Sequence, residues 1–160
     1  WVAEKPGLLR SLAVLFAHSG DSWFWAMGLL AVWVLGPPAW KITAVWMLAG
    51  IFLTAVIVFS VKLTVRRRRP EGEWGQIYRR TDPHSFPSGH AARAVLVAVL
   101  GIALGPIWFG WGLLVWAPLV MLARVAMGVH YLSDVLAGAL LGLGIGFFLL
   151  RVIPQLAFLP

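Results

Sequence analysis

The sequence predicts an all-α integral membrane protein, a bundle of about five transmembrane helices with a short interfacial helix at the N-terminus. Two features of its composition predict this class. Of the 160 residues, 61% are hydrophobic and only 12% are charged, about half of the charged share of a soluble domain. Ten tryptophans are present, and tryptophan concentrates at the two membrane interfaces. The length favours one membrane-embedded domain over residues 1–160.

The first third of the chain contains two short apolar segments and one long one. Residues 7–17 are too short to span a bilayer, which takes about 20 residues, and the polar sequence HSGDS follows them. We therefore expect a helix that lies in the membrane interface. Residues 23–35 predict a first, short membrane helix that ends at Gly36-Pro37-Pro38. Residues 42–61 are 20 uncharged residues and predict the clearest span.

A polar connection, residues 63–86, precedes the longest apolar segment. Residues 94–123 are 30 residues without a charge, and a single helix of that length would measure about 45 Å. The hydrocarbon core of a bilayer is only about 30 Å thick. Gly105-Pro106 and Gly110 therefore predict a tight turn between two short helices.

The last span is expected over residues 135–150, with Arg151 and Pro154 at its end. Three glycines recur every fourth residue along it, at Gly138, Gly142 and Gly146. Such a stripe of small residues suits close packing of helices, either within one bundle or in a dimer, and we favour the bundle. The sequence leaves the oligomeric state open.

Three polar segments interrupt the apolar chain, and the order of the spans predicts that all three lie on one face of the membrane. They are residues 62–70 (KLTVRRRRP), 87–90 (PSGH) and 123–134 (ARVAMGVHYLSD). The second span ends at the first segment, and the third span begins at the second segment. The fourth span returns to the third segment. Ionisable clusters beside hydrocarbon are costly, so they indicate function.

Charge and cysteine content exclude several kinds of site. The net charge is +7, and a soluble chain with the run RRRR would suggest nucleic acid as a partner. Here the arginines follow an apolar helix directly, so anionic lipid headgroups or phosphorylated substrates are the expected partners, and nucleic acid is not. The chain has no cysteine, which excludes a disulfide, a thiolate nucleophile and a thiolate metal site.

The first polar segment supplies cations. If its helix continues, Lys62, Arg66 and Arg69 share one face and Pro70 ends the run, so three cations can surround a phosphate. Arg67 and Arg68 face elsewhere, and we expect their side chains to reach lipid headgroups.

The second segment supplies a helix start. Ser88 is a plausible N-cap, and Gly89 lets backbone N–H groups approach a ligand closely. Because a helix N-terminus is a favourable anion site, His90 would lie beside the anion and could donate a proton. A single histidine at a helix start is also an ordinary capping or interfacial residue.

The third segment pairs a histidine with an acid. His130 and Asp134 are one helical turn apart, so the carboxylate can fix the histidine tautomer and leave the other ring nitrogen free to attack. Arg124 adds a phosphate donor. A structural His–Asp pair between two helices is the competing interpretation.

Together the segments resemble the signature of the type-2 phosphatidic acid phosphatase family, within the vanadium-haloperoxidase superfamily. That signature reads K-x6-R-P, then P-S-G-H, then S-R-x5-H-x3-D, and this chain matches it over residues 62–134. The resemblance covers roughly residues 42–150 with the intervening spans. One position departs from the pattern: Ala123 stands where the family has serine, which removes one hydroxyl near the site.

The resemblance implies a membrane lipid phosphatase that forms a phosphohistidine. It implies His130 as nucleophile, Asp134 as its orienting acid and His90 as general acid. It implies a phosphate cradle made of Lys62, Arg69, Ser88, Gly89 and Arg124. No metal and no other cofactor is implied, because the cations stabilise the charge that a metal ion would otherwise stabilise. Possible headgroup contacts are Arg66, Arg79, Arg80, His84 and Arg93.

Substrate and orientation follow from the resemblance only in part. Candidate substrates are phosphatidic acid, phosphatidylglycerol phosphate, polyprenyl diphosphates and phosphorylated lipid A. Of the 13 Lys and Arg, 11 fall on the face of the polar segments, which by the positive-inside rule favours the cytoplasm. Bacterial members generally face outward, and we expect that orientation, in a bacterial-type cytoplasmic membrane. Members often have six spans, so the family pattern leaves room for one span upstream.

Two other functions use the same residues. A lipid phosphotransferase would pass the phosphoryl group from the histidine to a second lipid. A non-enzymatic protein would use the cations only to bind anionic lipid. A soluble haloperoxidase is disfavoured, because the apolar spans have no role in one.

Overall fold

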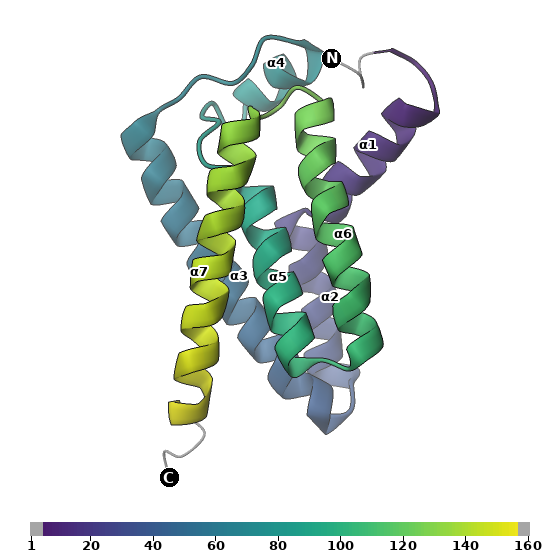
Figure 1. The fold of residues 1–160 in the computed structure, drawn as a ribbon, viewed down its shortest axis with the longest axis vertical. Coiled ribbons are helices and arrows are strands. Elements are labelled where there is room, and N and C mark those ends of the chain that lie inside the picture. Colours follow the sequence, from purple (N-terminus) through teal and green to yellow (C-terminus); the bar gives the residue numbers. More distant parts are fainter. Residues whose placement is uncertain (1–4, 157–160) are drawn as a thin grey trace.

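The computed structural model describes residues 5–156, and this part of the chain is built from helices alone (Figure 1). The helices are α1 (Leu8–Ser19), α2 (Ser22–Leu35), α3 (Pro38–Val65), α4 (Glu73–Arg79), α5 (Gly89–Leu104), α6 (Ile107–Ala126) and α7 (Leu132–Leu156). The expected all-α helix bundle is therefore confirmed.

The expected number of about five spans is not confirmed. Within the described residues three helical segments are long and apolar enough to cross a membrane, namely Pro38–Val65, Ile107–Ala126 and Leu132–Ile153. The shorter apolar helices α1, α2 and α5 have 12, 14 and 16 residues. Even α5 measures only about 24 Å, less than the hydrocarbon core.

The turn between α5 and α6 lies at Gly105-Pro106, as predicted, but the prediction that Gly110 belongs to this turn is wrong. Gly110 lies inside α6, where a Cβ would come within 2.9 Å of Ile102 Cα. The glycine is required by the close approach of α5 and α6, not by a turn. The short helix α4, within the polar connection, was also not predicted.

The prediction that Lys62, Arg66 and Arg69 share one helical face is wrong. The helix α3 ends at Val65, and Arg66 adopts the left-handed conformation with φ 51°, its N–H donating to Lys62 O at 3.0 Å. This C-cap changes the direction of the chain after α3. Arg66 is therefore exposed, whereas Arg69, in the connection that follows, is buried.

The centre of the bundle is α5, which packs against α3, α6 and α7. The glycine stripe of α7 lies on α5: a Cβ at Gly138 or Gly142 would overlap the carbonyl oxygen of Ser88 or Ala92. A Cβ at Gly146 would come within 2.8 Å of the Val99 side chain. The stripe therefore serves packing within the bundle, as favoured from the sequence.

One end of the bundle gathers the polar segments. In Figure 1 the end of α3, the helix α4 and the connection from α6 to α7 lie together at the top of the view. The expectation that the three segments share one face is confirmed, because residues from all three line one cavity there.

Candidate active site

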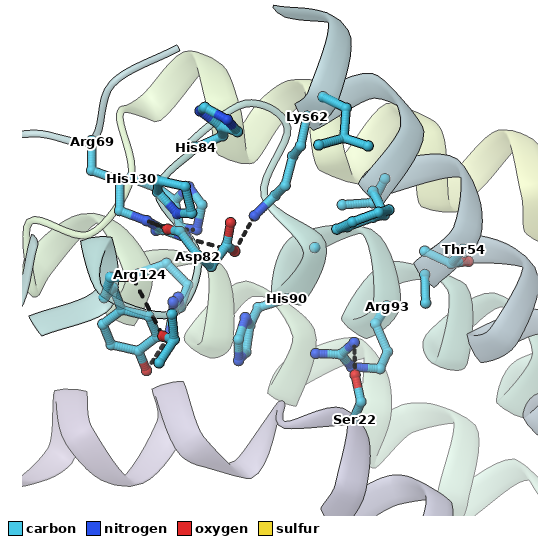
Figure 2. A pocket seen from close by; sticks show the side chains of 18 residues that line it. Ser22, Thr54, Lys62, Arg69, Asp82, His84, His90, Arg93, Arg124 and His130 are labelled. Carbon is cyan, nitrogen blue, oxygen red and sulfur yellow. Dashed lines mark hydrogen bonds and ion pairs between the residues drawn. The ribbon is translucent and has the colours of Figure 1, made fainter. Parts of the chain in front are cut away.

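A cavity of about 440 Å³ opens at this end of the bundle (Figure 2). Six of the residues predicted for catalysis or phosphate binding line it, together with two of the possible headgroup residues: Lys62, Arg69, Gly89, His90, Arg124 and His130, with His84 and Arg93. They come from α3, the connection to α5, α5 itself, α6 and the α6–α7 connection. Distant parts of the sequence thus place cations and two histidines around one space.

Arg124 is the most deeply buried cation of the cavity, with no exposed surface. Its Nη1 donates to Tyr78 Oη at 3.1 Å, and its guanidinium lies 4.7 Å from the centre of the Tyr78 ring. Its Nε has no hydrogen-bond partner among the described residues. A buried charged donor without an acceptor is costly, so an anion at this position would complete the site.

Asp82 forms ion pairs with two further cations of the cavity, Lys62 and Arg69. Its carboxylate pairs with Lys62 Nζ and, at 2.8 Å, with Arg69 Nη2 (Figure 2). Burial acts to raise the pKa of Asp82, but the hydrogen bond and charge of Lys62, with the charge of Arg69, outweigh it and lower the pKa. A phosphate bound by Lys62 and Arg69 would replace this carboxylate. The pairing of Asp82 with these two cations was not predicted from the sequence.

His130 is buried beside these cations, with its two ring nitrogens in different environments. Arg69 Nη1 lies 3.2 Å from His130 Nε2. Since arginine can only donate, Nε2 is the acceptor and the proton is on Nδ1. Nδ1 lies 3.7 Å from Asp134 Oδ2, slightly beyond hydrogen-bond distance, and has no other partner among the described residues. Hydrogen bonds between catalytic residues often tighten only in the reacting complex.

The environment of His130 keeps it uncharged. Burial is the largest cause, and with the charges of Arg124, Arg69 and Lys62 it lowers the pKa of His130 to about 3, although Asp134 acts in the opposite direction. At neutral pH the ring is therefore neutral, and its Nε2 lone pair faces the cations of the cavity. This is the state that a histidine nucleophile requires.

Arg67 forms an ion pair with Asp134. Arg67 Nη1 donates to Asp134 Oδ1 at 2.8 Å and to Ser133 Oγ at 2.7 Å, and its guanidinium stacks 4.2 Å over the Tyr131 ring. The backbone N–H of Tyr131 donates to the other carboxylate oxygen at 2.9 Å. The prediction that Arg67 reaches lipid headgroups is therefore wrong. This contact could not be predicted from the sequence, because it joins residues 67 positions apart.

Replacing Arg67 with alanine is expected to lower kcat roughly 10- to 100-fold, because a misplaced Asp134 no longer orients the nucleophile. The measurement is steady-state phosphate release by purified protein. Arg68→Ala is the matched control, since that side chain is exposed and only its backbone pairs with His84. Equal activity of the two variants would contradict the role of Arg67.

Ser88 forms the predicted N-cap of α5, with its side chain accepting from Ala91 N at 3.5 Å. It is fully buried and does not line the cavity, whereas Gly89 and His90 do. The backbone N–H of Ser88 donates to Asp134 O at 2.9 Å. This bond ties the second polar segment to the third and places His90 in the same cavity as His130.

The remaining predicted headgroup residues divide into two groups. His84 and Arg93 line the cavity, and Arg93 is buried with its Nε donating to Gly20 O at 2.8 Å. Arg66, Arg79 and Arg80 do not line it. Two further contacts of cavity residues were not predicted: Arg124 with Tyr78, on the unpredicted helix α4, and His90 with Asp21.

The sequence model described as the PAP2 superfamily matches residues 43–157, most of the chain. The chain belongs to this superfamily. It is 33% identical over 153 residues to decaprenylphosphoryl-5-phosphoribose phosphatase of Mycobacterium tuberculosis, a match that covers 91% of this chain and 80% of that protein. The family resemblance stated from the sequence is thereby confirmed.

Two solved structures share the fold. LpxE of Aquifex aeolicus superposes with a TM-score of 0.75 at 25% identity, over 94% of this chain and 90% of that one. A transmembrane PAP2-type phosphatidylglycerolphosphate phosphatase of Bacillus subtilis gives 0.75 at 24% identity, over 96% and 81%. Three helices of spanning length and the PAP2 family match make the chain an integral membrane protein.

Proposed function

We propose that this PAP2 protein hydrolyses a phosphate ester of a membrane lipid through a phosphohistidine on His130. The observation that carries the proposal is a cavity that combines a neutral, buried histidine with three buried cations. Within residues 5–156 the Arg124 Nε has no hydrogen-bond partner, and Lys62 and Arg69 share a carboxylate that a phosphate would replace.

The reaction then has two steps. His130 Nε2 attacks phosphorus, the bond from phosphorus to the lipid oxygen breaks, and His90 gives its proton to that oxygen. Water next attacks the phosphohistidine, the phosphorus–nitrogen bond breaks, and His90 takes a proton from the water. Lys62, Arg69 and Arg124 stabilise the negative charge in both transition states.

The walls of the cavity support a lipid substrate. Its α3 side is formed by apolar residues, among them Val58, Phe59 and Leu63. Phe59 is 63% exposed and Leu63 47%, on a helix of spanning length, so this wall borders the lipid phase. A phosphorylated lipid could therefore enter sideways from the bilayer, with its chain against α3 and its phosphate among the cations.

The substrate class is proposed from the cavity and the relatives together. We infer a lipid phosphomonoester or diphosphate, and a polyprenyl-linked sugar phosphate is the first to test because of the mycobacterial relative's name. We further propose that residues 1–160 act as one domain, without a metal, with the cavity facing outward from a cytoplasmic membrane. The outward orientation rests on family resemblance and opposes the charge distribution.

The test is phosphate release by detergent-purified protein against a panel of lipid monophosphates and diphosphates, with EDTA present. We expect release from at least one lipid, unchanged by EDTA. No release from any lipid would contradict the proposal, and a phosphorylated acceptor lipid in place of free phosphate would identify a phosphotransferase. Release that EDTA abolishes would contradict metal independence.

A further inference from the structure

The connection between α1 and α2 reaches into the active site, although it lies outside the residues that match the superfamily. Asp21, the N-cap residue of α2, lies 2.7 Å from His90 Nε2 through its Oδ1. The two residues are 69 positions apart. The PAP2 signature includes His90 but no partner for it, so the signature assigns no role to Asp21.

The connection is held rigidly against the site by several hydrogen bonds. Arg93 Nε donates to Gly20 O at 2.8 Å, and Arg93 Nη1 donates to Ser22 Oγ (Figure 2). Trp116 Nε1, on α6, donates to Ser19 Oγ at 2.9 Å. Gly20 itself packs tightly, since a Cβ there would come within 3.0 Å of Val120 Cγ1, and it would lie 3.4 Å from the His90 ring. Hydrogen bonds to the residues before and after Asp21 therefore hold its side chain beside His90.

The protonation state of the pair follows from the chemistry of its members. Burial acts to raise the pKa of Asp21, but hydrogen bonds from His90 and His18 and their charges lower it to about 2. Asp21 is therefore a carboxylate at neutral pH and can only accept, so His90 Nε2 carries a hydrogen. This leaves Nδ1, which makes no hydrogen bond within residues 5–156, as the atom that can exchange a proton with a ligand.

The charges around His90 show why such a partner matters. Arg93, from α5, and Arg124, from α6, line the same cavity and disfavour a protonated ring. Asp21 is the carboxylate that opposes them at His90, and His18 is bound to its other oxygen at 3.1 Å. Burial, the largest cause, and the charges of Arg124 and Arg93 lower the pKa of His90, and the hydrogen bond and charge of Asp21 act in the opposite direction. The carboxylate therefore favours the protonated ring that a general acid requires.

We propose that Asp21 is a positioning residue for the reaction, which orients His90 through Nε2 and stabilises its protonated form so that Nδ1 can donate to the leaving lipid oxygen. The inference rests on the proposed function, because it acts through His90 as general acid. The competing interpretation is a structural pair that only joins the N-terminal helices to α5.

Leaving-group dependence separates the two interpretations. A long-chain alkyl phosphate needs a proton on its leaving oxygen, whereas 4-nitrophenyl phosphate does not. Asp21→Asn is expected to lower kcat/KM for the alkyl phosphate ~10- to 100-fold and to change that for 4-nitrophenyl phosphate by no more than about 2-fold. The ratio of the two values does not depend on the fraction of folded protein, so partial misfolding does not imitate the effect.

A double-mutant cycle completes the test. Since Asp21 acts through His90, Asp21→Asn is expected to add no further loss in a His90→Ala background. His18→Ala removes the other partner of Asp21 and is expected to leave the ratio unchanged. An equal loss with both substrates, or a loss that adds fully to that of His90→Ala, would overturn the inference while the enzyme remains a phosphatase. If His90→Ala lowers kcat/KM equally for the alkyl phosphate and for 4-nitrophenyl phosphate, His90 is not the general acid. The proposed role of Asp21 then fails as well.

Discussion

Replacing His130 with alanine is expected to abolish lipid phosphate hydrolysis, with a fall in kcat of at least about 10⁴-fold. The reason is that the His130 ring is uncharged and its Nε2 carries a lone pair that faces the cations of the cavity. Without it no covalent intermediate forms, and water attacking directly would lack a positioned base. The cations would remain, so substrate binding should survive.

The measurement is phosphate release together with binding of the same lipid by the variant. His18→Ala is the control, because it removes an exposed histidine from the same end of the protein. A variant His130→Ala that releases phosphate within 10-fold of the wild-type rate would contradict the proposed nucleophile. It would leave the cationic cavity as a binding site only.

Replacing Arg124 with methionine is expected to lower kcat/KM about 10³-fold, close to 4 kcal/mol of transition-state stabilisation, without lowering thermal stability. Most substitutions of a fully buried residue destabilise a protein. Arg124 differs, because its charge is buried and its Nε finds no acceptor in the described part of the chain. A methionine of similar length removes the free-energy cost of this unpaired donor.

Thermal unfolding with and without inorganic phosphate measures both effects. Phosphate should stabilise the wild type and not Arg124→Met. Arg80→Met is the matched control, since Arg80 is exposed and lies outside the cavity. A marked loss of stability in Arg124→Met with phosphate binding intact would contradict the assignment of this arginine to the phosphate.

Much of the fold was predictable, because the length of an apolar segment and the position of glycine and proline residues indicate where helices and turns lie. The turn at Gly105-Pro106 and the N-cap at Ser88 followed from them. The end of α3 did not, because nothing in the run of arginines shows that Arg66 adopts a left-handed conformation. A long apolar segment also does not fix how much of a helix crosses the membrane, which is why the count of spans was not confirmed.

The site was predictable where residue spacing carries chemistry and not where the fold supplies the contact. Lys62, His90 and His130 were found from their motifs and line one cavity. Arg67 was misjudged and Asp21 was overlooked, because each meets its partner only after distant segments fold together. The polar stretch HSGDS between two apolar segments was the one available signal for Asp21, and by itself it indicates only a connection.

The most direct test of the account is to trap the intermediate. Protein mixed with a ³²P-labelled lipid phosphate is quenched in alkali, where phosphohistidine survives, and then digested with trypsin. Cleavage after Arg124 and Arg151 gives a peptide whose single histidine is His130, whereas His84 and His90 share the peptide that ends at Arg93. We predict label on the His130 peptide in the wild type and none in His130→Ala. Phosphate release without label, or label on the peptide that contains His90, would contradict His130 as the nucleophile.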